Sequence, residues 1–241
     1  MADTEFEVSH EGDPGDILYI GLSEFGMAGL TAINHVKDAL GLEETGHISA
    51  PGLVSITSFE EGKPRHHTRF FSGDNYSLLV GELFIPPFAT TAFSKSVLEW
   101  CRENEVEEIV FLTGIPVQHS EAEHDAYYVA SDDFREARLN DADVEPMGVG
   151  FLQGVYADIL QDGMDTPLKV GVFITPVHNV VQDIDASLRL LTTLQNLYGL
   201  ETDKSELEKH AREVNDYYSR LSHHVQEREQ DETKFYDRAF M

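Results

Sequence analysis

The residues best placed to bind a ligand stand in a turn, Ser23 to Gly29, after the apolar segment Ile17 to Leu22. Backbone N–H groups in such a turn, with the start of a following helix, can surround an anion. The turn lacks the Gly-x-Gly-x-x-Gly and Gly-Lys-Ser/Thr patterns of nucleotide sites, and Glu24 would repel a phosphate group. We therefore favour close strand–helix packing as the role of Gly26 and Gly29, with a pocket as the alternative.

A second group of candidate ligands lies in residues 119–125. It offers two imidazoles, His119 and His124, and three carboxylates, Glu121, Glu123 and Asp125, after an apolar segment that reads as a strand. These are side chains that bind metal ions, but their spacing is not the helical His-Glu-x-x-His arrangement. Because carboxylates occur throughout this chain, we favour a solvated loop and predict no metal site.

No assembled catalytic set is evident. The single cysteine, Cys101, follows Trp100 in an amphipathic segment, which predicts a buried and inert thiol. Ser23 stands in no Gly-x-Ser-x-Gly nucleophile pattern. We predict no catalytic residue and no cofactor, but a pocket formed by the turns after the long strands remains possible. Its residues would be Ser23, Gly26, Gly29, Thr113, Gly114, Gly148 and Gly150.

Charge is the strongest global signal. Aspartate and glutamate total 44 against 17 lysine and arginine residues, a formal net charge of −27, and the acids are spread along the chain. Such self-repulsion weakens a compact fold in dilute buffer and is screened by salt. The pattern favours adaptation to a salt-rich cytosol, as in a halophilic archaeon. With no basic stripe to neutralise phosphates, nucleic-acid binding is not expected.

Composition also indicates the compartment. No apolar run approaches the ~20 residues of a membrane-spanning helix. The first ten residues carry acids where a secretory signal would carry basic residues and an apolar block. One cysteine excludes an intrachain disulfide. A cytoplasmic protein without membrane association is therefore predicted.

Long apolar segments alternate with helical patterns. Strands are predicted at Ile17 to Leu22, Glu107 to Ile115 and Leu168 to Thr175. Helices are predicted at Phe88 to Asn104 and Val180 to Tyr198, each with one apolar face. The alternation predicts an α/β domain over residues 16–203 with a mostly parallel sheet covered on both faces.

Two further segments differ in character. Leu53 to Phe59, Arg65 to Phe71 and Tyr76 to Leu83 read as strands separated by short polar turns, which predicts an inserted antiparallel meander. Residues 1–15 are polar and contain Gly-Asp-Pro-Gly, which predicts a flexible lead-in.

The C-terminal part stands apart as a helix over residues 204–228 and a tail over residues 229–241. Ser205 and Glu208 fit a capping box at the start of this helix. Apolar residues then alternate spacings of four and three, which is the seam of a coiled coil. Packing back onto the domain and contact with a partner are both open for this seam. The candidate contact residues are Leu207, Val214, Tyr218 and Leu221.

The order of these pieces resembles the PAC2 family of proteasome assembly chaperone-like proteins. The resemblance rests on the turns Gly26 to Gly29, Thr113 to Pro116 and Gly148 to Gly154, then on Thr175-Pro176 and Gly199 to Asp203. No single motif is specific, but the ordered set covers most of the chain, from Ile17 to Val214.

The resemblance implies a three-layer α/β/α sandwich like those of nucleoside phosphorylases and hydrolases. It also implies a homo-oligomer, with a trimer as the first expectation, and proteasome α subunits as partners. Some members end in a hydrophobic–tyrosine–any tripeptide that docks between α subunits. Here Ala239, Phe240 and Met241 match it in part, and Phe235-Tyr236-Asp237 has the residue types at an internal position.

We therefore expect a non-catalytic, assembly-chaperone-like module that self-associates and binds protein subunits. The alternative is a small-molecule enzyme of the hydrolase or phosphorylase kind. Related folds host both, so the fold alone does not separate them.

Overall fold

The computed structural model describes residues 5–50, 57–117, 125–178 and 182–212. Contacts between residues divide the chain into one unit over residues 1–202 and a second over residues 203–241. Each unit is described by itself below. Within the described residues, no helix combines the length and the apolar character needed to cross a membrane.

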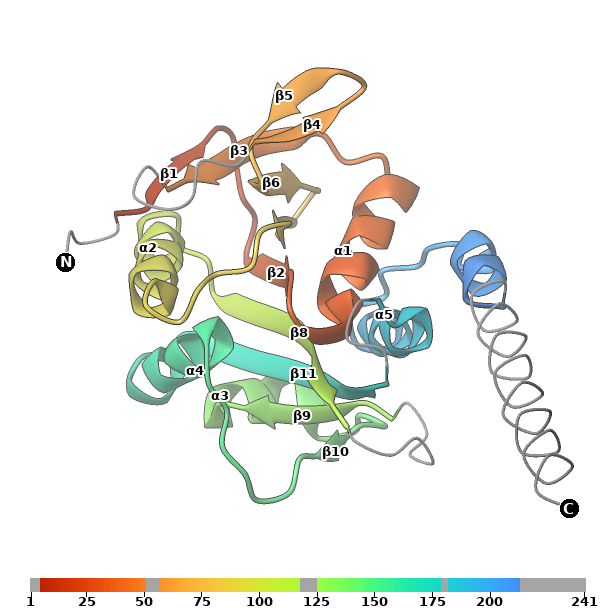
Figure 1. Cartoon of the computed structure of the whole chain (residues 1–241). Coiled ribbons are helices and arrows are strands. Elements are labelled where there is room, and N and C mark those ends of the chain that lie inside the picture. Colours follow the sequence, from red (N-terminus) through yellow and green to blue (C-terminus); the bar gives the residue numbers. More distant parts are fainter. Residues whose placement is uncertain (1–4, 51–56, 118–124, 179–181, 213–241) are drawn as a thin grey trace, which may run out of the picture. The chain divides into compact units, whose positions relative to one another are not determined.

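A large mixed sheet forms the centre of the first unit (Figure 1). Within the described residues it has nine strands, in the order β1 (Glu7–His10), β3 (Glu44–Ser49), β6 (Thr68–Ser72), β7 (Tyr76–Gly81), β2 (Ile17–Leu22), β8 (Glu108–Pro116), β11 (Lys169–Val177), β9 (Tyr127–Ala130) and β10 (Glu145–Pro146). The predicted apolar segments supply its middle strands β2, β8 and β11, because strands buried on both faces are apolar throughout.

The prediction of a mostly parallel sheet was wrong. Only β7, β2, β8 and β11 form a continuous parallel group, in which Tyr19 of β2 lies opposite Leu78 and Val110. The pairs β1–β3, β3–β6, β6–β7 and β9–β11 are antiparallel, and β9–β10 is parallel. A short turn joins β6 to β7, and so short a connection permits only an antiparallel pair.

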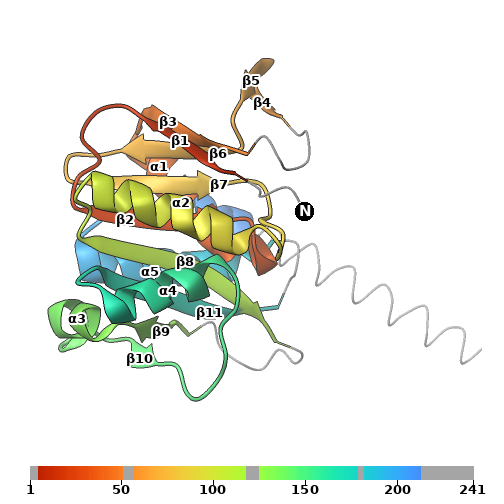
Figure 2. The same cartoon turned by 90° about the vertical axis from the view of Figure 1, so that its left-hand side faces the viewer.

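Two helices cover each face of the parallel strands (Figures 1 and 2). Helices α1 (Ala28–Ala39) and α5 (Ile184–Tyr198) pack together on one face, and α2 (Thr90–Glu103) and α4 (Val155–Asp165) on the other. The predicted three layers are therefore present. Each helix presents an apolar stripe to the sheet, as amphipathic helices do.

Local signals mark where α5 begins and ends. The Asp183 carboxylate accepts a hydrogen bond from the Ala186 backbone N–H at 3.1 Å, which satisfies a donor that the first turn leaves free. Gly199 ends the helix in the left-handed conformation, with φ 66°, that glycine adopts without strain.

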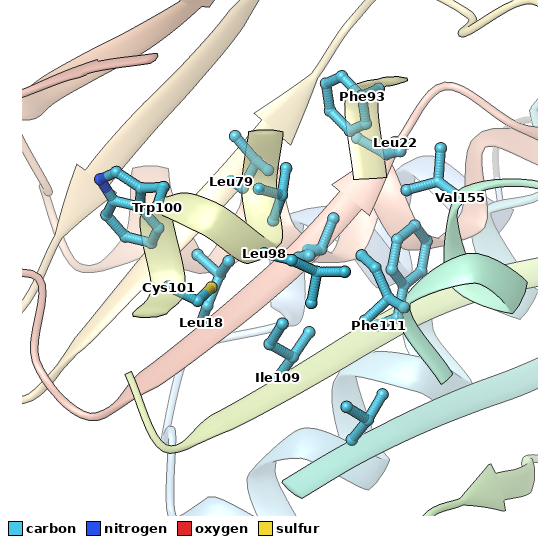
Figure 3. Packing of buried hydrophobic residues seen from close by; sticks show 14 of the residues in the cluster. Leu18, Leu22, Leu79, Phe93, Leu98, Trp100, Cys101, Ile109, Phe111 and Val155 are labelled. Atoms are coloured by element: carbon cyan, nitrogen blue, oxygen red, sulfur yellow. The ribbon is translucent and has the colours of Figure 1, made fainter. Parts of the chain in front are cut away.

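The core beneath α2 and α4 is continuous across the sheet. Figure 3 shows Leu18 and Leu22 of β2 beside Ile109 and Phe111 of β8, with side chains from α2 and α4 above them. Burial of this apolar surface is the main favourable contribution to folding. It holds the C-terminal ends of β2 and β8 together, next to the start of α4.

The antiparallel insertion after α1 is present, but its strands differ in part from the prediction. Strand β3 was not predicted, and β4 (Ser58–Glu60) and β5 (Lys63–Arg65) form a separate hairpin. Most of the segment predicted at Leu53 to Phe59 lies outside the described residues. Residues Glu7–His10, predicted in a flexible lead-in, form the edge strand β1.

Between β9 and α4 the chain forms short helical turns. Helix α3 (Asp132–Phe134) continues into the π-helical turn η2 (Arg135–Leu139). Residues 147–154 then form a loop, and α4 begins at Val155.

In the second unit, residues 205–212 are helical. The Asp203 carboxylate accepts hydrogen bonds from the Ser205 backbone N–H at 2.9 Å and from the Ser205 hydroxyl group at 2.5 Å. The structure thus gives Asp203 the N-terminal capping contact that the sequence assigned to Ser205 and Glu208. Val214, Tyr218, Leu221 and the tail residues Ala239, Phe240 and Met241 lie outside the described residues.

Candidate functional site

The turn between β2 and α1 is held by backbone contacts on two sides. The Ser23 N–H donates to the Gly81 carbonyl group of β7 at 2.8 Å, and the Asp183 N–H donates to the Gly26 carbonyl group at 2.8 Å. Gly26 and Met27 have left-handed φ angles of 67° and 47°. The turn is a 3₁₀ segment, η1 (Phe25–Met27), that places residues 23–25 at the C-terminal edge of the sheet.

Glycines in this region allow backbone to approach backbone. A Cβ atom on Gly29 would lie 1.9 Å from the Leu112 carbonyl oxygen, so only glycine lets α1 pack this closely on β8. A Cβ atom on Gly114 would lie 2.8 Å from the Phe25 carbonyl oxygen. The prediction that Gly29 serves close strand–helix packing is confirmed.

A cleft of about 360 Å³ opens at the C-terminal ends of β2 and β8, beside the start of α4. This volume falls within the ~300–1,000 Å³ of small-ligand pockets. Its apolar wall is made by Leu22, Phe25, Phe84, Ile85, Pro87 and Val155. Its polar side chains are those of Ser23, Glu24, Thr90, Gln153 and Tyr156, and Gly114 and Gly154 complete it.

Glu24 dominates the electrostatics of the cleft. Burial raises the pKa of its carboxyl group to about 7, and a short hydrogen bond donated by the Thr113 hydroxyl group opposes part of that rise. Among the described residues, no lysine, arginine or histidine lies within ion-pair distance of Glu24. The carboxyl group therefore exchanges its proton near neutral pH with no cation of the described residues beside it.

Tyr156 faces the same carboxyl group from α4. Burial, and to a smaller extent the nearby Glu24 carboxylate, together raise the pKa of its hydroxyl group to about 12. The phenol therefore stays neutral at physiological pH. It offers a hydrogen-bond donor and an aromatic ring to a ligand.

The described lining of the cleft suits binding better than nucleophilic catalysis. It supplies one carboxyl group and three hydroxyl groups, from Ser23, Thr90 and Tyr156, but no imidazole or thiol group. A hydroxyl nucleophile requires an adjacent base held in place by a third group. The groups present can accept or donate hydrogen bonds and attract a positive charge.

Two exposed phenyl rings line the cleft. Phe25 and Phe84 line it and are 54% and 56% exposed, and Phe88, just after the lining residue Pro87, is 65% exposed. Exposed phenyl rings gathered at one place mark an interaction surface more often than isolated ones do.

The candidate pocket residues fall into different places. Ser23 and Gly114 line the cleft, and Thr113 acts behind it through Glu24. Gly26 and Gly29 belong to the turn and to α1, outside the lining. Gly148 and Gly150 are exposed in the loop before α4, with nothing near the position of a Cβ atom.

His119 and His124, considered as metal ligands but assigned to a solvated loop, lie outside the described residues. Asp125 is described, and its carboxylate pairs with Arg189 at 3.4 Å. Within the described ranges, no cluster of three or more histidine, cysteine, aspartate or glutamate side chains is arranged to hold a metal ion.

A second buried carboxylate, Glu108, lies at the opposite end of β8 and was not singled out from the sequence. It is 2% exposed and accepts hydrogen bonds from Arg138 Nε at 3.0 and 3.2 Å and a short one from the Tyr198 hydroxyl group. The Arg138 guanidinium also lies 4.9 Å from the centre of the Tyr198 ring. Glu107, just before this strand, is exposed, and Glu108, the first residue of the strand, is buried.

Cys101 belongs to α2, on the face of the helix that is fully buried in the core. Burial raises the pKa of its thiol group far above the ordinary value, so the reactive thiolate form is suppressed. The predicted inert thiol is consistent with this placement.

A sequence model of the PAC2 family matches residues 18–222, which is most of the chain. The chain belongs to the PAC2 family. The resemblance read from the order of its glycine turns is thereby confirmed. None of the curated proteins compared with this PAC2 protein matches it.

Solved structures resemble the fold of this PAC2 protein. Pyrococcus furiosus PbaA, described as an archaeal homolog of proteasome-assembly chaperone, has a TM-score of 0.80 at 18% identity, covering 90% of this chain and 96% of that one. Pyrococcus furiosus PbaB, described as an archaeal proteasome activator, has a TM-score of 0.77 at 16% identity, covering 91% and 99%. A PAC2 family protein from Streptomyces avermitilis has a TM-score of 0.69 at 18% identity, covering 87% and 96%.

Proposed function

We propose that this PAC2 protein is a non-catalytic, proteasome-assembly-chaperone-like module that self-associates and binds proteasome subunits. The observation that carries the proposal is the family match over residues 18–222. Neighbours in fold that are described as an assembly-chaperone homolog and a proteasome activator support it.

The exposed rings of Phe25 and Phe84, which we call the aromatic rim of the cleft, add a structural reason. Both leave more than half of their surface in water, at a cost that contact with a partner would remove. Aromatic residues are also enriched at the energetic centres of protein interfaces.

Three finer parts of the proposal rest on the sequence. The first is a homo-oligomer, with a trimer as the starting expectation. The second is contact through the seam residues Leu207, Val214, Tyr218 and Leu221 and docking of residues 239–241 between α subunits. The third is a location in a salt-rich cytoplasm. The family resemblance adds the expectation of a fold similar to those of nucleoside phosphorylases and hydrolases.

A second candidate function is a small-molecule enzyme that uses the cleft. A carboxyl group with a strongly raised pKa in a concave site is a common mark of catalysis. The described lining offers no nucleophile with an adjacent base, so we rank this candidate below protein binding.

The deciding experiment mixes the purified chain with purified archaeal proteasome α subunits in molar KCl. Native mass spectrometry would give the stoichiometry, and fluorescence anisotropy the affinity. We expect a complex that weakens more than tenfold, which is about 1.4 kcal/mol, when Phe25 and Phe84 are both replaced by alanine. Phe59→Ala is the matched control, because Phe59 is an exposed phenyl ring on the β4–β5 hairpin, outside the cleft lining.

Deleting residues 239–241 tests tail docking in the same assay. Loss of the complex on deletion would support it, and unchanged affinity would exclude it. Absence of any complex between the full chain and α subunits would overturn the proposed function.

A further inference from the structure

We propose that the cleft at the C-terminal ends of β2 and β8 binds a lysine or arginine side chain presented by a protein partner, with the Glu24 carboxylate as its counter-ion. This inference rests on the protein-binding role proposed above, and it names the chemistry of the contact. Four observations carry it.

The first observation is the incomplete set of partners around Glu24. One carboxylate oxygen accepts the hydrogen bond from the Thr113 hydroxyl group, and no cation of the described residues lies beside the other. Elsewhere the same domain pairs its buried charges. Glu108 meets Arg138, and the buried Arg69 meets Glu82 at 2.7 Å. Glu24 is partly buried, and a carboxylate taken out of water without a cation is costly, so a ligand that supplies the cation removes that cost.

The second observation is the wall of the cleft. Leu22, Ile85 and Val155 offer apolar surface for the methylene stem of a long basic side chain, which packs well on such surface. The rings of Phe25, Phe84 and Tyr156 also line the cleft, and aromatic faces attract ammonium and guanidinium groups. Stem and charge are thus both matched.

The third observation points to a protein as the source of that side chain. Phe25 and Phe84 line the cleft and are still more than half exposed, and a free amine held in the cleft would leave this aromatic surface in water. A partner chain would cover it while one of its basic residues fills the cleft. Arginine is itself enriched at interface centres.

The fourth observation is the charge of the whole chain. Its formal net charge of −27 creates a negative potential that draws basic surfaces toward it and speeds encounter. Contacts with the aromatic rim and the cleft then determine which basic residue of the partner remains bound.

Pairing requires the ionised form of Glu24, so binding is coupled to loss of its proton. The titratable group that faces Glu24 is Tyr156 from α4, whose raised pKa keeps it neutral, and β8 contributes only the Thr113 hydroxyl group. Since the pKa of Glu24 is about 7, affinity for a cationic ligand should rise roughly tenfold between about pH 6 and about pH 8.

The test uses the full chain and a fluorescein-labelled peptide, acetyl-Gly-Leu-Lys-Leu-Gly-amide. The matched peptide has norleucine in place of lysine, which keeps the stem and removes the ammonium group. We expect the lysine peptide to bind at least about tenfold more tightly than the norleucine peptide. A hydrogen bond to a charged group contributes more binding free energy than a tenfold difference in affinity corresponds to. All measurements are made at one fixed KCl concentration.

Glu24→Gln should abolish both the preference for lysine and the pH dependence, because the amide keeps the shape and loses the charge. Glu103→Gln is the matched control. Glu103 is an exposed acid at the end of α2, so its replacement changes the net charge equally and leaves the cleft intact. Thermal melting shows that each variant is folded.

Equal binding of the two peptides, or a preference that survives in Glu24→Gln, would overturn the inference. Competition by n-butylamine as effective as that of the unlabelled lysine peptide would overturn the protein source, because the rim would then contribute nothing. The assay with α subunits separates the two proposals. If Glu24→Gln binds α subunits normally, the cleft assignment fails and the proposed function stands. If α subunits never bind but the lysine peptide is still preferred, the proposed function fails and the cleft assignment stands.

Discussion

Two carboxyl groups occupy opposite ends of the same parallel strands, one buried and one partly buried, and their surroundings differ. Glu108, at the start of β8, is held by the Arg138 guanidinium and the Tyr198 hydroxyl group. Glu24, just after β2, has one hydroxyl partner, Thr113, and opens onto a cleft. At one end of the sheet the charge of Glu108 is balanced by a cation of the chain. At the other end the charge of Glu24 is available to a ligand.

The difference separates a structural role from a binding role. A buried ion pair whose members also receive hydrogen bonds keeps local packing in place, and breaking it is costly. A buried carboxyl group without a cation weakens the fold whenever it ionises, so its presence is better explained by what it binds. Both groups are glutamates in an acidic chain, and only their neighbours distinguish them.

The largest expected effect comes from making the Glu108 end resemble the Glu24 end. Arg138→Met removes the cation and leaves Glu108 buried without it. We expect the free energy of unfolding at neutral pH to fall by about 3 kcal/mol, measured by urea denaturation.

Arg135→Met is the control for this variant. Arg135 lies on the same turn, η2, but is largely exposed and pairs only with the exposed Asp132 at 3.5 Å. Its loss should cost less than about 0.5 kcal/mol. Equal losses for the two variants would mean that Glu108 does not depend on its cation.

The next effect has the opposite sign. The pKa of Glu24 is about 7 in the folded chain, raised from the ordinary value of 4.5. Its ionisation therefore destabilises the fold as pH rises from about 4.5 to about 7, by at most about 3 kcal/mol at higher pH. Glu24→Gln should be more stable than the original chain at about pH 8 and equal to it at about pH 4.

Thermal and urea denaturation across this pH range measure the difference between the two proteins. Other acids titrate in both chains and cancel in the comparison. If the difference in unfolding free energy between the two proteins does not grow with pH, the charge of Glu24 is balanced by a cation in the folded state.

The smallest effect concerns the one partner that Glu24 has. Thr113→Val removes the hydroxyl donor, so the pKa of Glu24 should rise further, by about one unit. Carbon-detected NMR of the glutamate carboxyl groups reports this titration.

Thr175→Val is the matched control. Thr175 is a buried threonine in β11 whose hydroxyl group has no hydrogen-bond partner among the described residues. Its replacement should leave the titration of Glu24 unchanged. A shift of the same size in both variants would assign the effect to packing and remove the role of the Thr113 hydroxyl group.

The sequence predicted the central elements well, because burial on both faces leaves a clear record. Strands β2, β8 and β11 are continuous apolar runs, and α2 and α5 carry regular apolar faces. Strands β1 and β3 were missed, because partly exposed strands such as Glu7–His10 mix polar and apolar residues without a clear period.

The cleft could be predicted only in part. Ser23 and Gly114 follow from the rule that ligands bind at the C-terminal ends of parallel strands. Glu24 stood in the same turn and was considered only as a residue that would repel phosphate. Its raised pKa depends on burial and on Thr113, which lies 89 positions away in the sequence, so no local pattern could reveal it.

The glycines of the loop before α4 show a different limit. Gly148 and Gly150 resembled a tight turn near a pocket, yet both are exposed, and the lining comes from Gln153 to Tyr156 just beyond them. Small residues indicate where a backbone turns but do not indicate which neighbouring residue meets a ligand.

The placement of Cys101 has a practical consequence for spectroscopy. It is the only cysteine of the chain, and its thiol group is sealed in the core, so maleimide reagents should leave the folded protein unmodified. A single cysteine introduced at Phe88, next to the lining residue Pro87, could then carry a dye or a spin label near the cleft, with no prior removal of native thiols. The arrival of a partner would be followed there as a change in emission or in label mobility.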